Sequence, residues 1–374
     1  MVVSAVAATE YKYEKYVDTA MKIITTLLSG LMWCSAGICL SAEYGQVGDV
    51  CTDVEEFTNP IVDGGADPWV IRGDSCYYLS GSDGNTRIFI RCFRKLSEMK
   101  HSQGVLVYDA ANDSLKLNNL WGPHINCVNG EWYIYFCAQQ NVDKSLTSQR
   151  MWVLKSESGT PFGPYVNKGE VLRSQNKEWA IDGSVLQKKN GELYFVWSGI
   201  ERQSIADGSL HQKIFIARML DPTQVDRSTI TLIASPTEPW ETSAHPILEG
   251  SRPLYVDENG KTILMYSANA SWTDEYCLGS LTNVDGDFLN ASAWKKSSAP
   301  LFQKTDSVYG PGGASYVKTF DGKEDWIIYH AARSKGAGWI RNLRAQRFTW
   351  DAHHNPIFGK PLAPGVKMQL PSGE

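Results

Sequence analysis

The stretch NGEWYIYF at residues 129–136 combines a turn signal with a run of aromatic and β-branched residues. Asn-Gly favours the tight hairpin turns that need positive φ, and the residues after it have high strand propensity. Similar aromatic or apolar runs recur at intervals of roughly 55 to 70 residues, as expected for a repeated strand-rich unit. The five runs are CYYL (76–79), WYIYF (132–136), LYFVW (193–197), TILMY (262–266) and WIIYH (326–330). The pattern predicts an all-β chain folded as a five-bladed β-propeller.

A short segment with chemically useful side chains precedes each of these runs. In a propeller, the innermost strand of each blade lines the central axis, so five equivalent positions are expected to converge on one cavity. Three of them carry carboxylates, namely Asp67, Asp182 and Glu249. Carboxylates brought together in this way suit acid–base hydrolysis of a glycosidic bond.

The local sequence suggests a different role for each carboxylate. Asp67 begins a strand next to Trp69, which suits a general base that activates water near a sugar. Glu249 lies between apolar residues, so burial should raise its pKa and make it a general acid. Asp182 occupies the corresponding position of the middle repeat and could tune the acid. The alternative is structural: Asp67 and Asp182 as turn residues, and Glu249 paired with Arg252.

Aromatic residues near these segments are candidate sugar platforms. Trp69 lies two residues after Asp67, and Trp121 and Trp272 lie close to other segments of the predicted cavity. Tryptophan also packs protein cores, so a core role is the alternative for Trp121 and Trp272. The chain has 374 residues, with 13 Trp and 17 Tyr, and a net charge of −5. This charge argues against a polyanionic partner such as nucleic acid.

Residues 21–42 are expected to be a signal peptide or an uncleaved membrane anchor. Residues 23–42 are almost entirely apolar or small and follow Lys22, which is typical of a leader, but the run is also long enough to span a bilayer. No role is predicted for the extension 1–20, and 43–57 is a lead-in to a propeller domain at 58–374. Secretion would permit disulfides. Cys76 and Cys92 are placed to face each other across one hairpin, either as a disulfide or as buried thiols.

The ordered motifs from about Thr58 to Lys360 resemble glycoside hydrolase family 43, and most closely its α-L-arabinofuranosidases. The motifs are ADPWV (66–70), GEWYIYF (130–136), PFGPY (161–165), WAIDGSVL (179–186), LYFVWSG (193–199), YSA (266–268), EDWIIYH (324–330) and RAQRFTW (344–350). The resemblance implies Asp67 as general base, Asp182 as pKa modulator and Glu249 as general acid. It also implies inversion of configuration, with carboxyls about 6.5–9.5 Å apart, and a substrate contact from Arg344.

Two positions depart from the family pattern. The family usually has a glutamate where this chain has His124, which alters the charge near the cavity and makes His124 a candidate substrate contact. The family's axial histidine, which often coordinates a metal or water, is Gly313 here. The departure at Gly313 argues against a structural calcium ion, and no cofactor is expected to be required.

The sequence therefore predicts a secreted exo-acting hydrolase that removes terminal α-L-arabinofuranosyl units from plant polysaccharides or oligosaccharides. Nucleic acid is not expected as a partner, and a membrane only if the leader is an uncleaved anchor. Two alternatives remain at this point. A β-xylosidase of the same family would share the carboxylates, and the departures at His124 and Gly313 would also fit a carbohydrate-binding propeller with little catalysis.

Overall fold

The computed structural model describes residues 57–140, 148–174, 178–257 and 260–374. The predicted leader or anchor at 21–42, the extension before it and nearly all of the lead-in lie outside these residues. In the described part of the chain, no helix is both long enough and apolar enough to cross a membrane.

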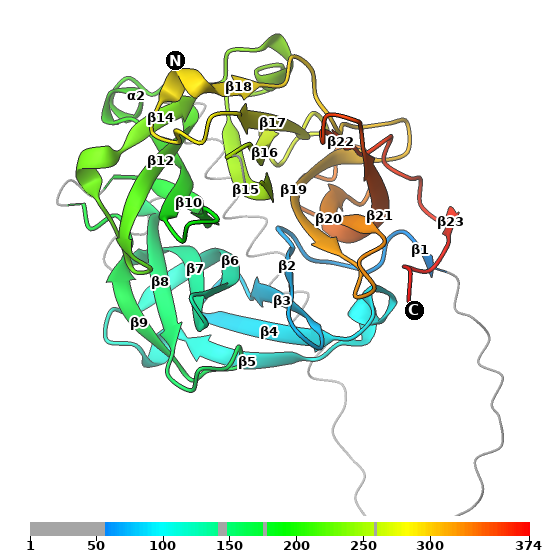
Figure 1. The fold of residues 1–374 in the computed structure, drawn as a ribbon, viewed down its shortest axis with the longest axis horizontal. Helices are drawn as coiled ribbons and strands as arrows, with labels where there is room; N and C mark the ends of the chain where they lie inside the picture. The colour runs from blue at the N-terminus through cyan, green and yellow to red at the C-terminus, as the bar shows by residue number, and fades with distance from the viewer. Residues whose placement is uncertain (1–56, 141–147, 175–177, 258–259) are drawn as a thin grey trace, which may run out of the picture. The chain divides into compact units, whose positions relative to one another are not determined.

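Five antiparallel sheets surround a central axis, which confirms the predicted five-bladed propeller (Figure 1). Each blade begins with its innermost strand and continues outward in chain order, except that the last two strands of the third blade both pair with its third strand. The first two blades comprise β2 (Trp69–Arg72), β3 (Tyr77–Ser82), β4 (Arg87–Phe93) and β5 (Gly104–Asp109), then β6 (Leu117–Val128), β7 (Glu131–Gln140), β8 (Arg150–Ser156) and β9 (Tyr165–Glu170). The third comprises β10 (Ala180–Gln187), β11 (Leu193–Ile200), β12 (Gln212–Asp221), β13 (Gln224–Val225) and β14 (Thr231–Ala234), with the helix α2 (Arg202–Ala206) between β11 and β12.

The fourth blade comprises β15 (Leu248–Val256), β16 (Thr262–Ala268), β17 (Cys277–Asn283) and β18 (Trp294–Lys296). The fifth comprises β19 (Tyr309–Lys318), β20 (Asp325–Ala332), β21 (Arg341–Trp350) and β22 (Pro356–Ile357). Short 3₁₀ helices lie between strands: η1 (Leu96–His101), η2 (Ala110–Asn112), η4 (Arg227–Thr229), η5 (Pro239–Glu241) and η6 (Ala291–Ala293).

The recurring aromatic runs are found on the second strand of each blade. Both faces of these strands pack on neighbouring blades, and every residue of β11 and β16 is buried. Strands buried on both faces read as continuous apolar runs rather than alternating ones. Asn129 and Gly130 have φ of 53° and 81° and connect β6 to β7, as the turn signal predicted.

Apolar side chains form five clusters, each located between two adjacent blades. The cluster between blades two and three contains Tyr135, Phe195 and Trp197, with ring centroids 5.5 Å apart for the first pair and 6.1 Å for the second. Burial of each such side chain is worth about 1.5–3 kcal/mol before the entropy of ordering is subtracted. The blades are therefore held by contacts between neighbours rather than by one central core.

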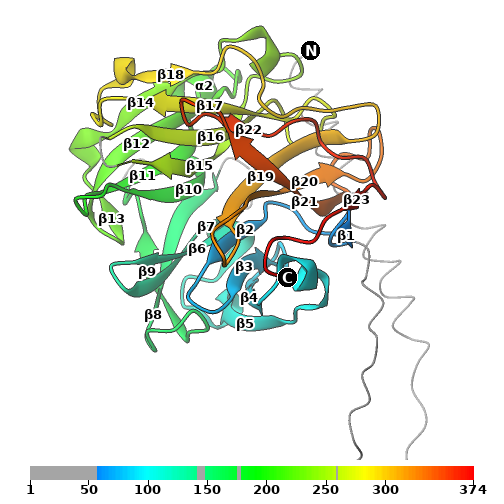
Figure 2. The same cartoon turned by 45° about the vertical axis from the view of Figure 1, so that its right-hand side comes forward.

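The N-terminal segment of the described chain completes the ring on the fifth blade. Strand β1 (Phe57–Thr58) pairs with β23 (Lys367–Met368), and the two strands lie beside each other in Figure 2. The buried Asn59 accepts a hydrogen bond from the Ala345 amide and donates one to its carbonyl, both 2.9 Å long. Residues on both sides of the junction between the first and last blades are thereby fixed in place.

The disulfide alternative holds for the first hairpin. Cys76 and Cys92 are bonded, with their Cα atoms 6.1 Å apart, at one end of the β3–β4 pair. In the described residues, the free cysteines are Cys127, Cys137 and Cys277.

Candidate active site

Four of the five innermost strands interrupt their regular pairing near the axis. Register shifts occur in β6, β10, β15 and β19, and Asp67 precedes β2 with φ of 46°. Asp182 has φ of 54° and Gly250, which follows Glu249, has φ of 63°. Bulges of this kind redirect side chains, and here they accompany the turn of Asp182 and Glu249 toward the axis.

Hydrogen bonds and a ring contact link Asp67, Glu249 and Asp182 into one continuous group. The Asp67 amide donates to Nδ1 of His330 at 3.0 Å, and the His330 ring stacks on Tyr276 at 5.6 Å between centroids. The Tyr276 hydroxyl donates to Oε1 of Glu249 at 2.9 Å. The amide of Gly250 donates to Oδ2 of Asp182 at 3.0 Å. The structure thus brings together the three carboxylates that the sequence indicated.

The environments of the three carboxylates differ in a chemically useful way. The Glu249 residue is only 8% exposed, whereas the Asp67 side chain is 38% exposed. Burial, with a further contribution from Asp182, raises the pKa of Glu249 well above the usual range. Burial also raises the pKa of Asp182, and Asp67 adds to the shift while Arg252 opposes it. A protonated Glu249 suits a general acid, and the accessible Asp67 suits a base that contacts water.

Other polar groups that complete this site were not predicted from the sequence. Tyr276 and His330 connect Glu249 to Asp67, and Arg252 does not pair with Glu249 as the structural alternative supposed. Arg341 lowers the pKa of both Asp182 and Glu249, and its guanidinium donates to the Ser271 carbonyl at 2.7 Å. The only sequence signal for Tyr276 and Arg341 was that each follows a loop after a second strand.

Two candidate sugar contacts, Trp69 and His124, are instead buried in the axial core. Trp69 is 6% exposed and His124 is 1% exposed, and their rings stack with centroids 4.0 Å apart and planes 16° apart. The Trp69 indole N–H donates to the Ile125 carbonyl at 2.6 Å. Contacts from neighbouring blades cover both residues, so neither presents a platform to a sugar.

Arg344 is likewise not placed beside the carboxylates. It is 1% exposed, and its Nε donates to Oδ1 of Asn342 at 2.9 Å. Arg341 and Arg344 are three residues apart on β21, so they point to opposite faces of the strand. Arg341, unlike Arg344, lowers the pKa of both Glu249 and Asp182.

The remaining two tryptophans differ in accessibility. Trp272 is 43% exposed and meets Trp339 edge-on, with ring centroids 5.6 Å apart, in a loop beside Arg341. Trp121 is partly buried against the cluster between blades two and three, and its indole donates to Oδ1 of Asn119 at 2.7 Å. Trp272 therefore retains an open surface suited to stacking.

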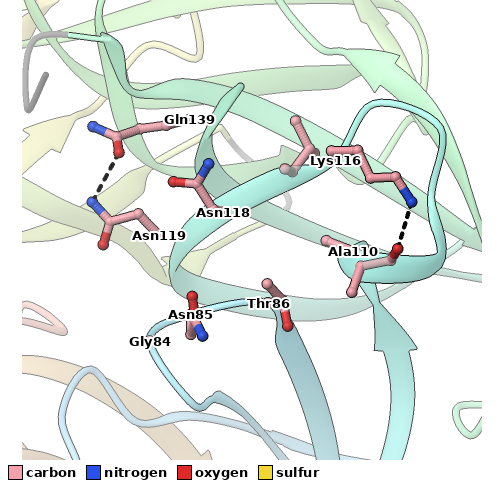
Figure 3. A pocket seen from close by; sticks show the side chains of 10 residues that line it. Gly84, Asn85, Thr86, Ala110, Lys116, Asn118, Asn119 and Gln139 are labelled. Carbon is pink, nitrogen blue, oxygen red and sulfur yellow. Dashed lines mark hydrogen bonds between the residues drawn. The ribbon is translucent and has the colours of Figure 1, made fainter. Parts of the chain in front are cut away.

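A separate cleft of about 530 Å³ lies between the first two blades (Figure 3). Side-chain amides, among them those of Asn118, Asn119 and Gln139, line much of it, and Lys116 donates to the Ala111 carbonyl at its edge. None of the predicted catalytic or sugar-binding residues lines this cleft. The carboxylate group at the axis is therefore the candidate catalytic centre.

Comparison with known proteins agrees with this architecture. The family model for glycosyl hydrolases family 43 matches residues 57–356, and the chain belongs to this family. An extracellular exo-α-(1→5)-L-arabinofuranosidase from Streptomyces avermitilis is 31% identical over 322 residues, which are 83% of this chain and 64% of that protein. The chain thus spans just under two thirds of that relative's length.

This chain matches a larger share of two further relatives. An extracellular exo-α-(1→5)-L-arabinofuranosidase from Streptomyces chartreusis is 29% identical over 285 residues, which are 75% of this chain and 83% of that protein. The crystal structure of an α-L-arabinofuranosidase from Lactobacillus brevis superposes with a TM-score of 0.74 at 25% identity, covering 83% of this chain and 98% of that one. The resemblance to family 43 is confirmed.

Proposed function

We propose that this chain is a secreted, inverting exo-glycosidase that releases terminal α-L-arabinofuranosyl residues from plant cell-wall polysaccharides such as arabinan and arabinoxylan. The observation that carries the proposal is the contact path Asp67–His330–Tyr276–Glu249, which joins an accessible carboxylate to a buried one whose pKa burial raises. Relatives named as exo-α-L-arabinofuranosidases support the substrate class. The Cys76–Cys92 disulfide supports an oxidising compartment, in line with secretion.

In the proposed reaction, Asp67 accepts a proton from water while the water oxygen attacks the anomeric carbon. The bond from that carbon to the leaving oxygen breaks, and Glu249 transfers its proton to that oxygen. Asp182 keeps Glu249 protonated through its negative charge and holds the Gly250 amide. Trp272 and Trp121 are proposed to contact the sugar chain, and Arg341 the bound pentose.

The acid and base assignments predict different responses to leaving-group chemistry. Asp67→Asn and Glu249→Gln should each lower kcat at least about 100-fold on a nitrophenyl arabinofuranoside. A dinitrophenyl leaving group needs no protonation, so it should restore much of the activity of Glu249→Gln and none of Asp67→Asn. Glu192→Gln, at a glutamate 46% exposed on the surface, serves as the matched control.

Product analysis tests both the mechanism and the pentose. NMR of the first product should show the inverted anomer, and incubation with arabinan, arabinoxylan and xylan should release arabinose. A retained anomer would contradict the roles of Asp67 and Glu249. Release of xylose alone would reassign the protein as a β-xylosidase, and sugar binding without release would reassign it as a binding propeller.

A further inference from the structure

A buried arginine occupies the centre of the propeller beneath the carboxylates. Arg252 lies on β15 and is 3% exposed. One terminal nitrogen of its guanidinium donates to the carbonyls of Pro68 at 2.5 Å and Ala314 at 2.7 Å. The other lies 3.4 Å from Nε2 of His124, and the guanidinium carbon is 5.0 Å from the centre of the Trp69 ring.

These contacts reach every blade. Arg252 belongs to the fourth blade, Pro68 directly precedes the first innermost strand, and Ala314 lies on the fifth. His124 belongs to the second, and its Nδ1 is 2.9 Å from the Gly183 carbonyl on the third. A neutral His124 with its proton on Nδ1 satisfies both sides, because Nδ1 then donates to Gly183 and Nε2 accepts from Arg252.

The donor atoms at this position are not suited to a divalent metal ion. A guanidinium has only donors, and it already engages the Pro68 and Ala314 carbonyls and the lone pair of His124. At His330, Nδ1 accepts from the Asp67 amide, so the neutral ring carries its proton on Nε2 and offers no lone pair there. In the described residues, no group of three or more His, Cys, Asp or Glu side chains is arranged to hold a metal.

The family's axial histidine corresponds to Gly313, and that position cannot simply regain a side chain. A Cβ at Gly313 would lie 2.5 Å from Cε1 of His330 and 2.8 Å from Oδ1 of Asp67. The His330 ring and the Asp67 carboxylate therefore occupy the space next to this backbone. The charge of Arg252 acts on both Asp67 and Asp182, which are the acidic groups that interact with it most strongly.

We propose that Arg252 is the permanent axial cation of this propeller. It joins the five innermost strands, positions the backbone next to Asp67 and favours the ionised form of Asp182, so that the site works without a divalent metal ion. Arg252 is a positioning residue, since it contacts the backbone beside Asp67 rather than the reacting atoms. The activity readouts rest on the proposed function, but the metal and stability readouts do not.

Metal content and thermal stability provide the first test, on the full chain as expressed. Elemental analysis of the purified protein should find no stoichiometric calcium or other divalent metal. The Tm should not change when EDTA or excess calcium is added. About one divalent ion per chain, or a Tm that EDTA lowers and calcium restores, would overturn the proposal even if the substrate assignment failed.

Substitutions of Arg252 provide the second test. Arg252→Met leaves two buried carbonyls without donors and removes the charge, so Tm and kcat/KM should fall, the latter at least about tenfold. It should also move the acidic limb of the pH profile to higher pH. Asp182 must be ionised to act on Glu249, and loss of this cation raises the pKa of Asp182. Arg252→Lys retains the charge but not the planar fork, so Tm should fall while the acidic limb stays in place.

Controls separate a charge effect from a packing effect. The groups that face Arg252 and titrate or carry charge are Asp67, Asp182, His124, Tyr276, Tyr316 and His330. Arg227→Met removes a half-buried arginine that pairs with Glu178 in the third blade and should leave the profile unchanged. An unmoved limb in a folded Arg252→Met would refute the electrostatic role. If Arg252→Met does not fold, the metal analysis and Arg252→Lys still decide, because a shifted limb in Arg252→Lys contradicts the proposal.

Discussion

At the scale of single residues, burial and neighbouring charge determine which carboxyl can donate a proton. Glu249 lies beneath the surface against Tyr276, while Asp67 remains open to solvent. Because a buried carboxylate loses hydration, its neutral form persists to higher pH. This difference supports the proposed roles of Glu249 as acid and Asp67 as base at the same pH.

Opposite pH shifts are expected from two neighbours of Glu249. Asp182→Asn removes a negative charge that raises the pKa of Glu249, so the basic limb of kcat/KM should move to lower pH. Tyr276→Phe removes a hydrogen bond that lowers this pKa, so the same limb should move to higher pH. Phe retains the ring that stacks on His330. Profiles on an aryl arabinofuranoside measure both shifts, and shifts in the same direction would contradict the assignment of Glu249 as the acid.

Trp272 should affect long substrates more than small ones. Its open surface lies in the loop beside Arg341, where it can stack on a sugar of the chain. Loss of the indole removes a large apolar contact surface for a sugar ring, so Trp272→Ala should raise KM for arabino-oligosaccharides several-fold. KM for a nitrophenyl arabinofuranoside should change little. Trp132→Ala is the control, at a partly buried indole packed between the first two blades. An unchanged KM for oligosaccharides in Trp272→Ala would remove Trp272 from the binding surface.

At the scale of elements, the second strands and their turns could be predicted because their signals are local. Asn-Gly favours a tight turn, and the Tyr- and Ile-rich run after it favours a strand. Together they predict a hairpin from adjacent residues alone. The innermost strands were harder to predict, because their bulges depend on contacts between blades. Trp69 and His124 look like site residues in sequence, and only the contact with Arg252, 128 residues from His124 in the chain, shows that they are core.

The prediction for Arg344 illustrates the same limit. The sequence offers two arginines at the start of one strand, and strand parity decides which faces the site. That parity depends on the register of β20 and β21, where Arg341 pairs with Ala332 and Arg344 with Tyr329. The resemblance to family 43 identified the three carboxylates because their motifs are contiguous and specific. It could not identify Arg252, which lies in none of the motifs on which the resemblance rests.

The bulge in β19 provides a test at the element scale. Gly313→Ala places a Cβ against His330 and Asp67 at a φ of 55°, so both strain and overpacking are expected. Gly322 has φ of 74° with open space around it, so Gly322→Ala measures the backbone strain alone, about 1–2 kcal/mol. Gly313→Ala should cost about 1–3 kcal/mol more and also lower kcat, because Asp67 must move. Urea unfolding and kinetics on both variants make the comparison, and equal losses would show that the axis has room to spare at Gly313.

At the scale of the whole molecule, a ring of blades is stable only if its first and last members are joined. Each apolar cluster lies between two neighbours, so an open junction would expose the cluster that contains Phe57, Val70 and Ile328. The junction also carries the proposed base, since the amide of Asp67 in the first blade donates to His330 in the fifth. The contacts that close the ring therefore also hold the proposed base in place.

This coupling predicts that a distant closure residue affects both stability and catalysis. Asn59→Ala removes two hydrogen bonds to Ala345 and leaves a buried amide and carbonyl unpaired, at a cost of about 1–3 kcal/mol each. We expect a lower Tm, and kcat should fall more steeply with temperature than in the parent protein as the first blade detaches from the fifth. Asn190→Ala removes an exposed turn contact to the Glu192 amide and should change neither. A Tm loss in Asn59→Ala with no effect on kcat up to unfolding would show that the Asp67–His330 contact survives without this closure.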